Sequence, residues 1–203
     1  FPQVGELQMP DYSTSEPAPE ICVRQWINSP EPITLKGMRG RPVLIHAFQM
    51  LCPACVAHGL PQTEKAFQLF RETDLAVIGL HTVVEHHEAM SPLALEAFVH
   101  EYRLSFPIGI DMPGRGTPIP ETMKRYQTRG TPKTILVGRD GRLITHEFGQ
   151  IDDLALGAMI ASVLNHGIHR ASAKSDPEPM SEETSHCDTG GCVASQFDKN
   201  SNR

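Results

Sequence analysis

Residues 43–55 read VLIHAFQMLCPAC, and this stretch decides the fold. Its first half, Val43 to Phe48, is a continuous apolar run of the kind that forms a strand buried on both faces. Pro53 suits the first position of a helix, so Cys52 would be the N-cap residue. The sequence therefore predicts a buried strand that leads directly into a helix, with two cysteines at the junction.

The position of these cysteines favours thiol chemistry. The unpaired N–H groups and the dipole at a helix N-terminus stabilise a thiolate on Cys52, and the thiolate is the form that attacks a disulfide. Cys55 lies one turn further into the helix, where it is close enough to displace a mixed disulfide. We predict that Cys52 is the nucleophile and Cys55 the resolving thiol. The alternative interpretation, that the pair is half of a zinc site, is disfavoured because the chain has no second C-x-x-C.

Outward from this junction, the pattern predicts further strands at 33–35, 75–80, 106–110, 134–137 and 142–148. Predicted helices cover 91–104, 121–126 and 152–167, the last of them ending at Gly167. Pro61 predicts a kink in the helix that carries the cysteines. Together these elements predict one mixed α/β sheet with helices on both faces. The predicted organisation is an extended lead-in at 1–20, a domain at 21–169 and a flexible tail at 170–203.

The composition is that of an ordinary soluble domain. The 203 residues carry 18 Lys and Arg against 24 Asp and Glu, a formal charge of −6, and 39% are hydrophobic. The acidic balance disfavours nucleic acid as a partner. No apolar run approaches the length that spans a bilayer, so we expect no membrane insertion. We also expect a monomer.

The sequence resembles the thioredoxin-like superfamily, most closely the TlpA/ResA-type thiol–disulfide oxidoreductases or redoxins, over residues 33–166. The resemblance is carried by Leu35 with residues 39–45, by Cys52-Pro53-Ala54-Cys55, by Gly59-Leu60-Pro61, and by Tyr126 with residues 130–134 and Asp140-Gly141 beyond.

The resemblance implies a thioredoxin fold, with the helix at 91–104 inserted between the second and third core strands. It implies that Thr131–Pro132 is a cis peptide opposite the dithiol, where Thr131, Pro132 and Pro53 would border the substrate. It also implies disulfide exchange without a cofactor or a metal. The partners would be disulfide- or thiol-containing proteins together with a redox donor or acceptor.

Three residues depart from the pattern of these relatives. Leu51 stands where Trp is usual before the first cysteine, and His58 stands where Glu is frequent. His46 occupies a position where relatives often carry a buried Asp that relays protons to the resolving thiol. Two interpretations of His46 remain open: a proton relay that titrates nearer neutrality, or a core histidine held by one backbone hydrogen bond.

The other candidate groups give weaker signals. Cys187 and Cys192 form a second pair, which three interpretations fit: an accessory redox disulfide, which is favoured, a metal-binding tail or an inert dithiol. The histidines of the segment 85–88 do not share a helix face, so a solvated loop is the better interpretation. Cys22 has no partner in the sequence and is expected to be a small buried hydrophobe.

These observations predict a thiol–disulfide oxidoreductase that works through Cys52 and Cys55. A peroxiredoxin-type peroxide reductase is one alternative, but Gln49 stands where that chemistry needs Thr or Ser. A metal carrier that uses the cysteine pairs is the other alternative. The sequence weakly favours the cytoplasm, with the periplasm as the alternative if a signal peptide was removed.

Overall fold

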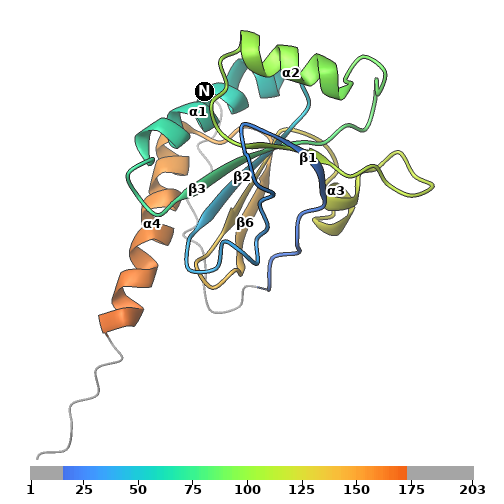
Figure 1. Ribbon diagram of the computed structural model, residues 1–203. Helices are drawn as coiled ribbons and strands as arrows, with labels where there is room; N and C mark the ends of the chain where they lie inside the picture. Colours follow the sequence, from blue (N-terminus) through green and yellow to red (C-terminus); the bar gives the residue numbers. More distant parts are fainter. Residues whose placement is uncertain (1–15, 173–203) are drawn as a thin grey trace, which may run out of the picture.

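The computed structural model describes residues 16–172, in which a six-stranded sheet is covered by helices (Figure 1). The strand order is β1-β4-β3-β2-β5-β6. The strands are β1 (Val23–Ile27), β2 (Val43–Phe48), β3 (Ala76–His81), β4 (Ile108–Asp111), β5 (Lys133–Val137) and β6 (Leu143–Phe148). The helices are α1 (Leu60–Leu69), α2 (Pro92–Glu101), α3 (Glu121–Arg125) and α4 (Asp153–Ser172), and a π-helical turn η1 (Cys55–Gly59) precedes α1.

Strand β2 lies in the middle of the sheet, as its apolar run predicts. It pairs in parallel with β3 and antiparallel with β5, and all six of its residues are buried. Strands β3 and β4 are parallel, whereas β1 and β6 close the two edges by antiparallel pairing. The sheet is therefore mixed, which confirms the predicted fold class, and α2 is the predicted insertion between β3 and β4.

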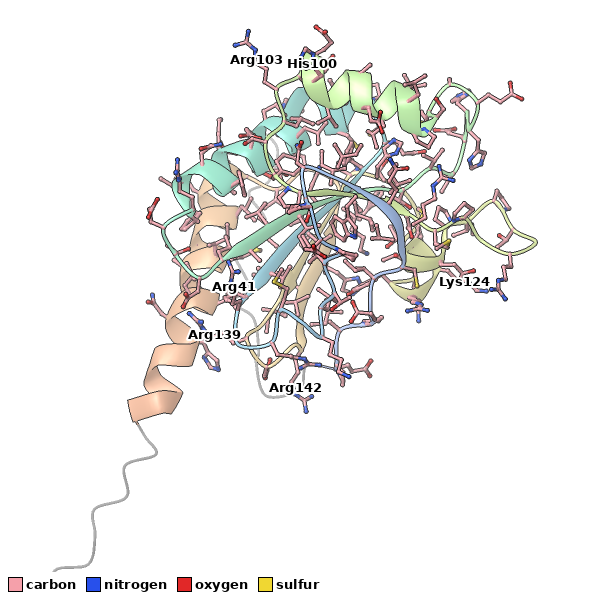
Figure 2. All side chains as sticks on the ribbon, in the orientation of Figure 1. Arg41, His100, Arg103, Lys124, Arg139 and Arg142 are labelled. Atoms are coloured by element: carbon pink, nitrogen blue, oxygen red, sulfur yellow. The ribbon has the colours of Figure 1, made fainter. Side chains whose placement is uncertain are left out.

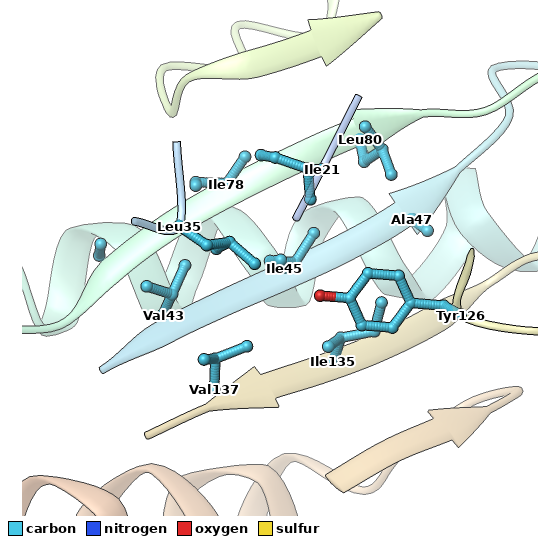
Figure 3. Packing of buried hydrophobic residues seen from close by; sticks show 11 residues of the cluster. Ile21, Leu35, Val43, Ile45, Ala47, Ile78, Leu80, Tyr126, Ile135 and Val137 are labelled. Carbon is cyan, nitrogen blue, oxygen red and sulfur yellow. The ribbon is translucent and has the colours of Figure 1, made fainter. Parts of the chain in front are cut away.

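The two faces of the sheet are covered by different elements. Helices α1, α2 and α4 pack on one face, through apolar residues of α1 and α4 around Leu44 and through those of α1 and α2 around Phe48. The opposite face carries the cluster shown in Figure 3, where Ile45 lies among Ile78, Ile135 and the ring of Tyr126, which follows α3. We call this set the apolar-face cluster; its buried members are Ile21, Leu35, Val43, Ile45, Ala47, Ala76, Ile78, Leu80, Tyr126, Ile135 and Val137.

The junction after β2 confirms the predicted strand-to-helix transition. The helix begins at Pro53, and Cys52 stands immediately before it. The turn η1 is wide, because the N–H of Leu60 bonds to the carbonyl oxygen of Cys55 five residues back. Pro61 has no N–H to give to an α-helical bond, so the departure from regular helix falls where a kink was predicted.

Two predictions about elements were wrong. Residues 33–35 form no strand, because the backbone N–H groups of Leu35 and Lys36 bond to the carboxylate of Glu20 rather than to a neighbouring strand. Gly167 does not end the last helix, since α4 continues to Ser172. A glycine inside a helix costs only about 1 kcal/mol, and the helix here continues past it.

Residues 16–20, which the sequence places in the lead-in, pack on the body. The N–H of Leu143 bonds to the carbonyl oxygen of Glu16, and the N–H of Ala18 bonds to that of Gly141. The hydroxyl of Tyr126 donates to the carbonyl oxygen of Pro19 at 2.6 Å. Within the described part of the chain, no helix combines the length and the apolar character that crossing a bilayer requires.

Candidate active site

The two cysteines of the junction differ in exposure but lie together. Cys52 is partly exposed, whereas Cys55 is fully buried. Their sulfur atoms are 2.6 Å apart, and both cysteines are free. The backbone N–H of Cys55 also donates to the Cys52 sulfur at 3.3 Å. A small movement would bring the sulfurs to the disulfide length of about 2.0 Å, so this pair can open and close a disulfide.

The electrostatic setting of the pair makes the two thiols unequal. Burial, and next the hydrogen bond with Cys52, raise the pKa of the Cys55 thiol to about 12. Cys55 therefore holds its proton at neutral pH. Cys52 stands at the start of the helix, where backbone N–H groups favour a negative charge. The accessible sulfur is thus the one that the local dipoles assist as an anion.

A loop with a cis peptide faces the pair. The Thr131–Pro132 bond is cis, as the family resemblance implies. The carbonyl oxygen of Thr131 lies 3.7 Å from the Cys52 sulfur, so the backbone just before Pro132 runs beside the reactive atom. Leu51, which replaces the usual Trp, is 54% exposed beside Cys52 and supplies an apolar surface.

Gln49 is a component of the site that the sequence analysis did not assign. It is buried, and its side-chain Nε2 donates to the Thr131 hydroxyl at 3.2 Å. Its Oε1 accepts the backbone N–H of Val84 at 3.0 Å, in the segment that follows β3. A signal was present: a polar side chain stands between a buried strand and a reactive pair, where burial requires hydrogen-bond partners.

His46 lies beneath the helix that carries the cysteines. The ring is 3% exposed, and burial lowers its pKa to about 4, so the imidazole is neutral. Its Nε2 is buried without a hydrogen-bond partner in the described structure. This atom faces Gly59 so closely that a Cβ at residue 59 would overlap the ring. The role of His46 as a proton relay stays a prediction.

The structure contains a second buried histidine, which the sequence pattern did not predict. His81, at the end of β3, is 1% exposed, and its pKa is lowered to about 4 by burial and next by the charge of Arg24. The Phe48 ring lies near both histidines, with its centroid 6.4 Å from that of His46 and 5.3 Å from that of His81. The apolar run that ends in His81 predicts a strand, but the local pattern does not indicate that the histidine is buried.

The remaining candidates lie outside this constellation. His58 is exposed on η1, and residues 85–88 form an exposed loop, as predicted. Cys22 is partly buried and bonds through its backbone to Thr122. Among residues 16–172, no group of three or more His, Cys, Asp or Glu could hold a metal ion. Cys187 and Cys192 lie outside the described residues.

Basic side chains gather away from the dithiol. Figure 2 shows Arg41, Arg139 and Arg142 at the end of the sheet where β2 begins, opposite to the end where Cys52 follows it. Two of them support the fold, because Arg139 bonds to the Asp74 carboxylate and Arg41 to the Asp74 carbonyl oxygen. These cations therefore do not belong to the dithiol surface.

Known proteins resemble the chain over this region. The model of the AhpC/TSA family matches residues 14–146. The curated protein DipZ of Mycobacterium tuberculosis is 28% identical over 151 residues, which cover 73% of this chain and 21% of DipZ. The thiol-disulfide oxidoreductase ResA of Halalkalibacterium halodurans is 29% identical over 126 residues, which cover 61% of this chain and 64% of ResA.

Two solved structures are more similar to this chain in sequence than DipZ and ResA are. A thiol-disulfide isomerase from Corynebacterium glutamicum is 45% identical, with a TM-score of 0.70, and the match covers 73% of this chain and 96% of that one. A thioredoxin-like superfamily protein is 51% identical, with a TM-score of 0.71 and the same two coverages. The fold is therefore thioredoxin-like.

Proposed function

Since the chain belongs to the AhpC/TSA family, we propose that it exchanges disulfides with protein partners through Cys52 and Cys55. The enzyme class, thiol–disulfide oxidoreductase, is that of its homologues and structural neighbours. One observation carries the proposal: an accessible sulfur lies 2.6 Å from a buried one, beside the carbonyl group of Thr131.

The proposed reaction has two displacements. The Cys52 thiolate attacks one sulfur of a substrate disulfide, so a bond forms between Cys52 and the substrate and the other substrate sulfur leaves as a thiolate. The Cys55 thiol then loses its proton and attacks the Cys52 sulfur, which releases the second substrate thiolate. The substrate is reduced by two electrons, and the Cys52–Cys55 disulfide is formed. A thiol-containing donor reverses these steps, and the same pair can oxidise a dithiol substrate.

The surroundings of Cys52 would bind the substrate. Thr131 and Pro132 would offer their backbone to the segment that carries the substrate disulfide, and Pro53 would border it from the helix side. The support for this assignment is the 3.7 Å contact between the Thr131 carbonyl oxygen and the Cys52 sulfur.

His46 is the proposed proton acceptor for Cys55. It is neutral above a pH of about 4, and its Nε2 faces Gly59, one turn of helix beyond Cys55. The second displacement requires deprotonation of the Cys55 thiol, whose pKa is raised, while burial makes the His46 imidazole a weak base. The support for this role is therefore the position of the unpartnered Nε2 against the helix that carries Cys55. If His46 acts in this way, a His46→Leu variant slows the release of substrate from Cys52 and leaves the first displacement unchanged.

The test is reduction of insulin by the chain in the presence of dithiothreitol. The wild type should accelerate precipitation of the freed insulin chains, and Cys52→Ser should abolish the acceleration. In a separate incubation with insulin without dithiothreitol, Cys55→Ser should accumulate a mixed disulfide on Cys52, visible as a mass increase that later addition of dithiothreitol removes. Cys22→Ser is the matched control and should behave as the wild type. Activity that survives in Cys52→Ser would disprove the assignment.

The alternatives give other outcomes in parallel experiments. Rapid turnover of hydrogen peroxide with a sulfenic acid on Cys52 would favour a peroxide reductase. Stoichiometric zinc or copper on the reduced protein, lost when residues 170–203 are removed or when Cys52 and Cys55 are replaced, would favour a metal carrier. A different reduction potential in the Cys187→Ser/Cys192→Ser variant would support the proposed accessory disulfide. The cytoplasmic location stays a prediction.

A further inference from the structure

The side chain of Gln49 joins segments from three parts of the chain around the dithiol. It follows β2 and precedes Cys52 by three residues. Its Nε2 donates to the Thr131 hydroxyl at 3.2 Å, and its Oε1 accepts the Val84 N–H at 3.0 Å. The amide thus uses its donor end on the cis-proline loop and its acceptor end on the segment after β3.

We propose that Gln49 is a positioning residue that holds Thr131 at the distance from Cys52 that binding of a protein disulfide requires. The inference rests on the proposed function and adds to it a side chain that does not touch the reacting sulfurs. Gln49 would act through the Thr131 hydroxyl, whereas the substrate would meet the Thr131 backbone.

The chemistry of the side chain supports this role. An amide is neutral and offers a donor and an acceptor at one end of a flexible stem, so it can bond to a hydroxyl and to a backbone N–H at once. Gln49 is only 5% exposed, where water competes little for its hydrogen bonds and an unpaired polar group is costly. The two bonds therefore give Thr131 a defined place relative to the strand that ends before Cys52.

The consequence for the reaction depends on the size of the substrate. A small disulfide needs only the Cys52 sulfur, because it can approach without contacting the loop. A protein disulfide also needs the backbone beside Cys52, where the Thr131 carbonyl oxygen lies 3.7 Å from the sulfur. Loss of the Gln49 link should therefore weaken the reaction with a protein and spare the reaction with a small molecule.

The experiment compares Gln49→Met, which keeps the length and removes both hydrogen bonds, with Thr131→Val, which removes only the hydroxyl. Each variant should raise the KM for insulin by up to roughly tenfold, the change expected for one net hydrogen bond, with kcat changed less. The rate at which Cys52 reacts with 5,5′-dithiobis(2-nitrobenzoate), and its pH profile, should stay at the wild-type values. Gln68→Met, the same substitution on the exposed side of α1 at a glutamine that bonds to Glu64, is the matched control.

Coupling and rescue separate positioning from a general structural role. The double variant should be no worse than the poorer single variant, because both changes break one link, and Thr131→Ser should restore the wild-type KM. Additive losses, an unchanged KM in both single variants, or equal slowing with the small disulfide would each overturn the role of Gln49. If Gln49→Met does not fold, Thr131→Val and Thr131→Ser still decide the point. A wild type that does not reduce insulin refutes the proposed function itself, and the inference with it.

Discussion

The two faces of the central sheet are both buried, yet they are built differently. On β2, Val43, Ile45 and Ala47 point into the apolar-face cluster, whereas the alternate residues Leu44, His46 and Phe48 meet the helices. The apolar-face cluster includes one ionisable side chain, Tyr126, whose hydroxyl is hydrogen-bonded, and the buried Lys133 pairs with Ala47 on the same face. The helix-covered face holds His46 and His81 with an unpartnered nitrogen each. The two buried histidines therefore make the stability contributed by the helix-covered face depend on pH.

The largest expected loss of stability comes from a substitution in the apolar-face cluster. Ile45 is fully buried between neighbouring strands, and Ile45→Ala should lower the free energy of unfolding by about 4 kcal/mol, because it removes buried methyl groups and leaves a cavity. Denaturant unfolding at pH 7 measures the loss. The reaction of Cys52 with a small disulfide should not change under native conditions. A loss below about 1 kcal/mol would show that this face is not closely packed.

The next largest expected effect is a loss of stability at low pH that comes from His46 on the helix-covered face. The pKa of His46 falls from 6.5 in the unfolded chain to about 4 in the fold, so the unfolded state binds the proton more readily. The contribution of neutral His46 is fully present above pH 6.5 and is lost as the pH falls toward 4, by about 3 kcal/mol in total.

The measurement is denaturant unfolding of the wild type and of His46→Leu at several pH values. The stability difference, wild type minus variant, should fall by that amount between pH 6.5 and 4. Asp111, whose pKa is raised by burial, is present in both proteins and cancels in the difference. A difference independent of pH would mean that His46 titrates normally in the fold.

The smallest expected effect lies where the helix meets His46. A Cβ on Gly59 would overlap the His46 ring, so Gly59→Ala should force the ring to move and cost about 2 kcal/mol. Gly157→Ala is the matched control, because a Cβ there meets nothing within 4 Å, and it should be neutral or slightly stabilising. Thermal unfolding of the two variants checks the contrast, and equal melting temperatures would contradict the contact.

Much of this arrangement follows from local patterns in the sequence. The apolar run before Cys52 predicted a strand buried on both faces, and Pro53 predicted where the helix begins; both are confirmed. The cis bond at Thr131 came from the family resemblance and is also confirmed. The strand and the start of the helix depend on neighbouring residues, so a local sequence pattern is enough to predict them, whereas the cis bond required the comparison with a family.

The missed features depend on residues far apart in the chain. Residues 33–35 alternate as a strand does, but the backbone N–H groups of Leu35 and Lys36 bond to the Glu20 carboxylate, which lies 15 and 16 residues earlier in the chain. Gln49 meets Thr131 across a separation of 82 residues, and no local pattern encodes that contact. The burial of His81 likewise depends on how β3, α2 and their loops come together.

The wide turn at Cys55–Gly59 separates two orientations that a regular helix would tie together. An additional residue in a helix advances its phase by about 100°. The face of α1 that packs on the sheet and the direction in which Cys52 and Cys55 present their sulfurs are thus set independently. Deleting one residue from this turn would restore regular helical winding. Leu60 and Ala66 could then keep their positions in the core, or the sulfurs could keep theirs beside Thr131, but not both.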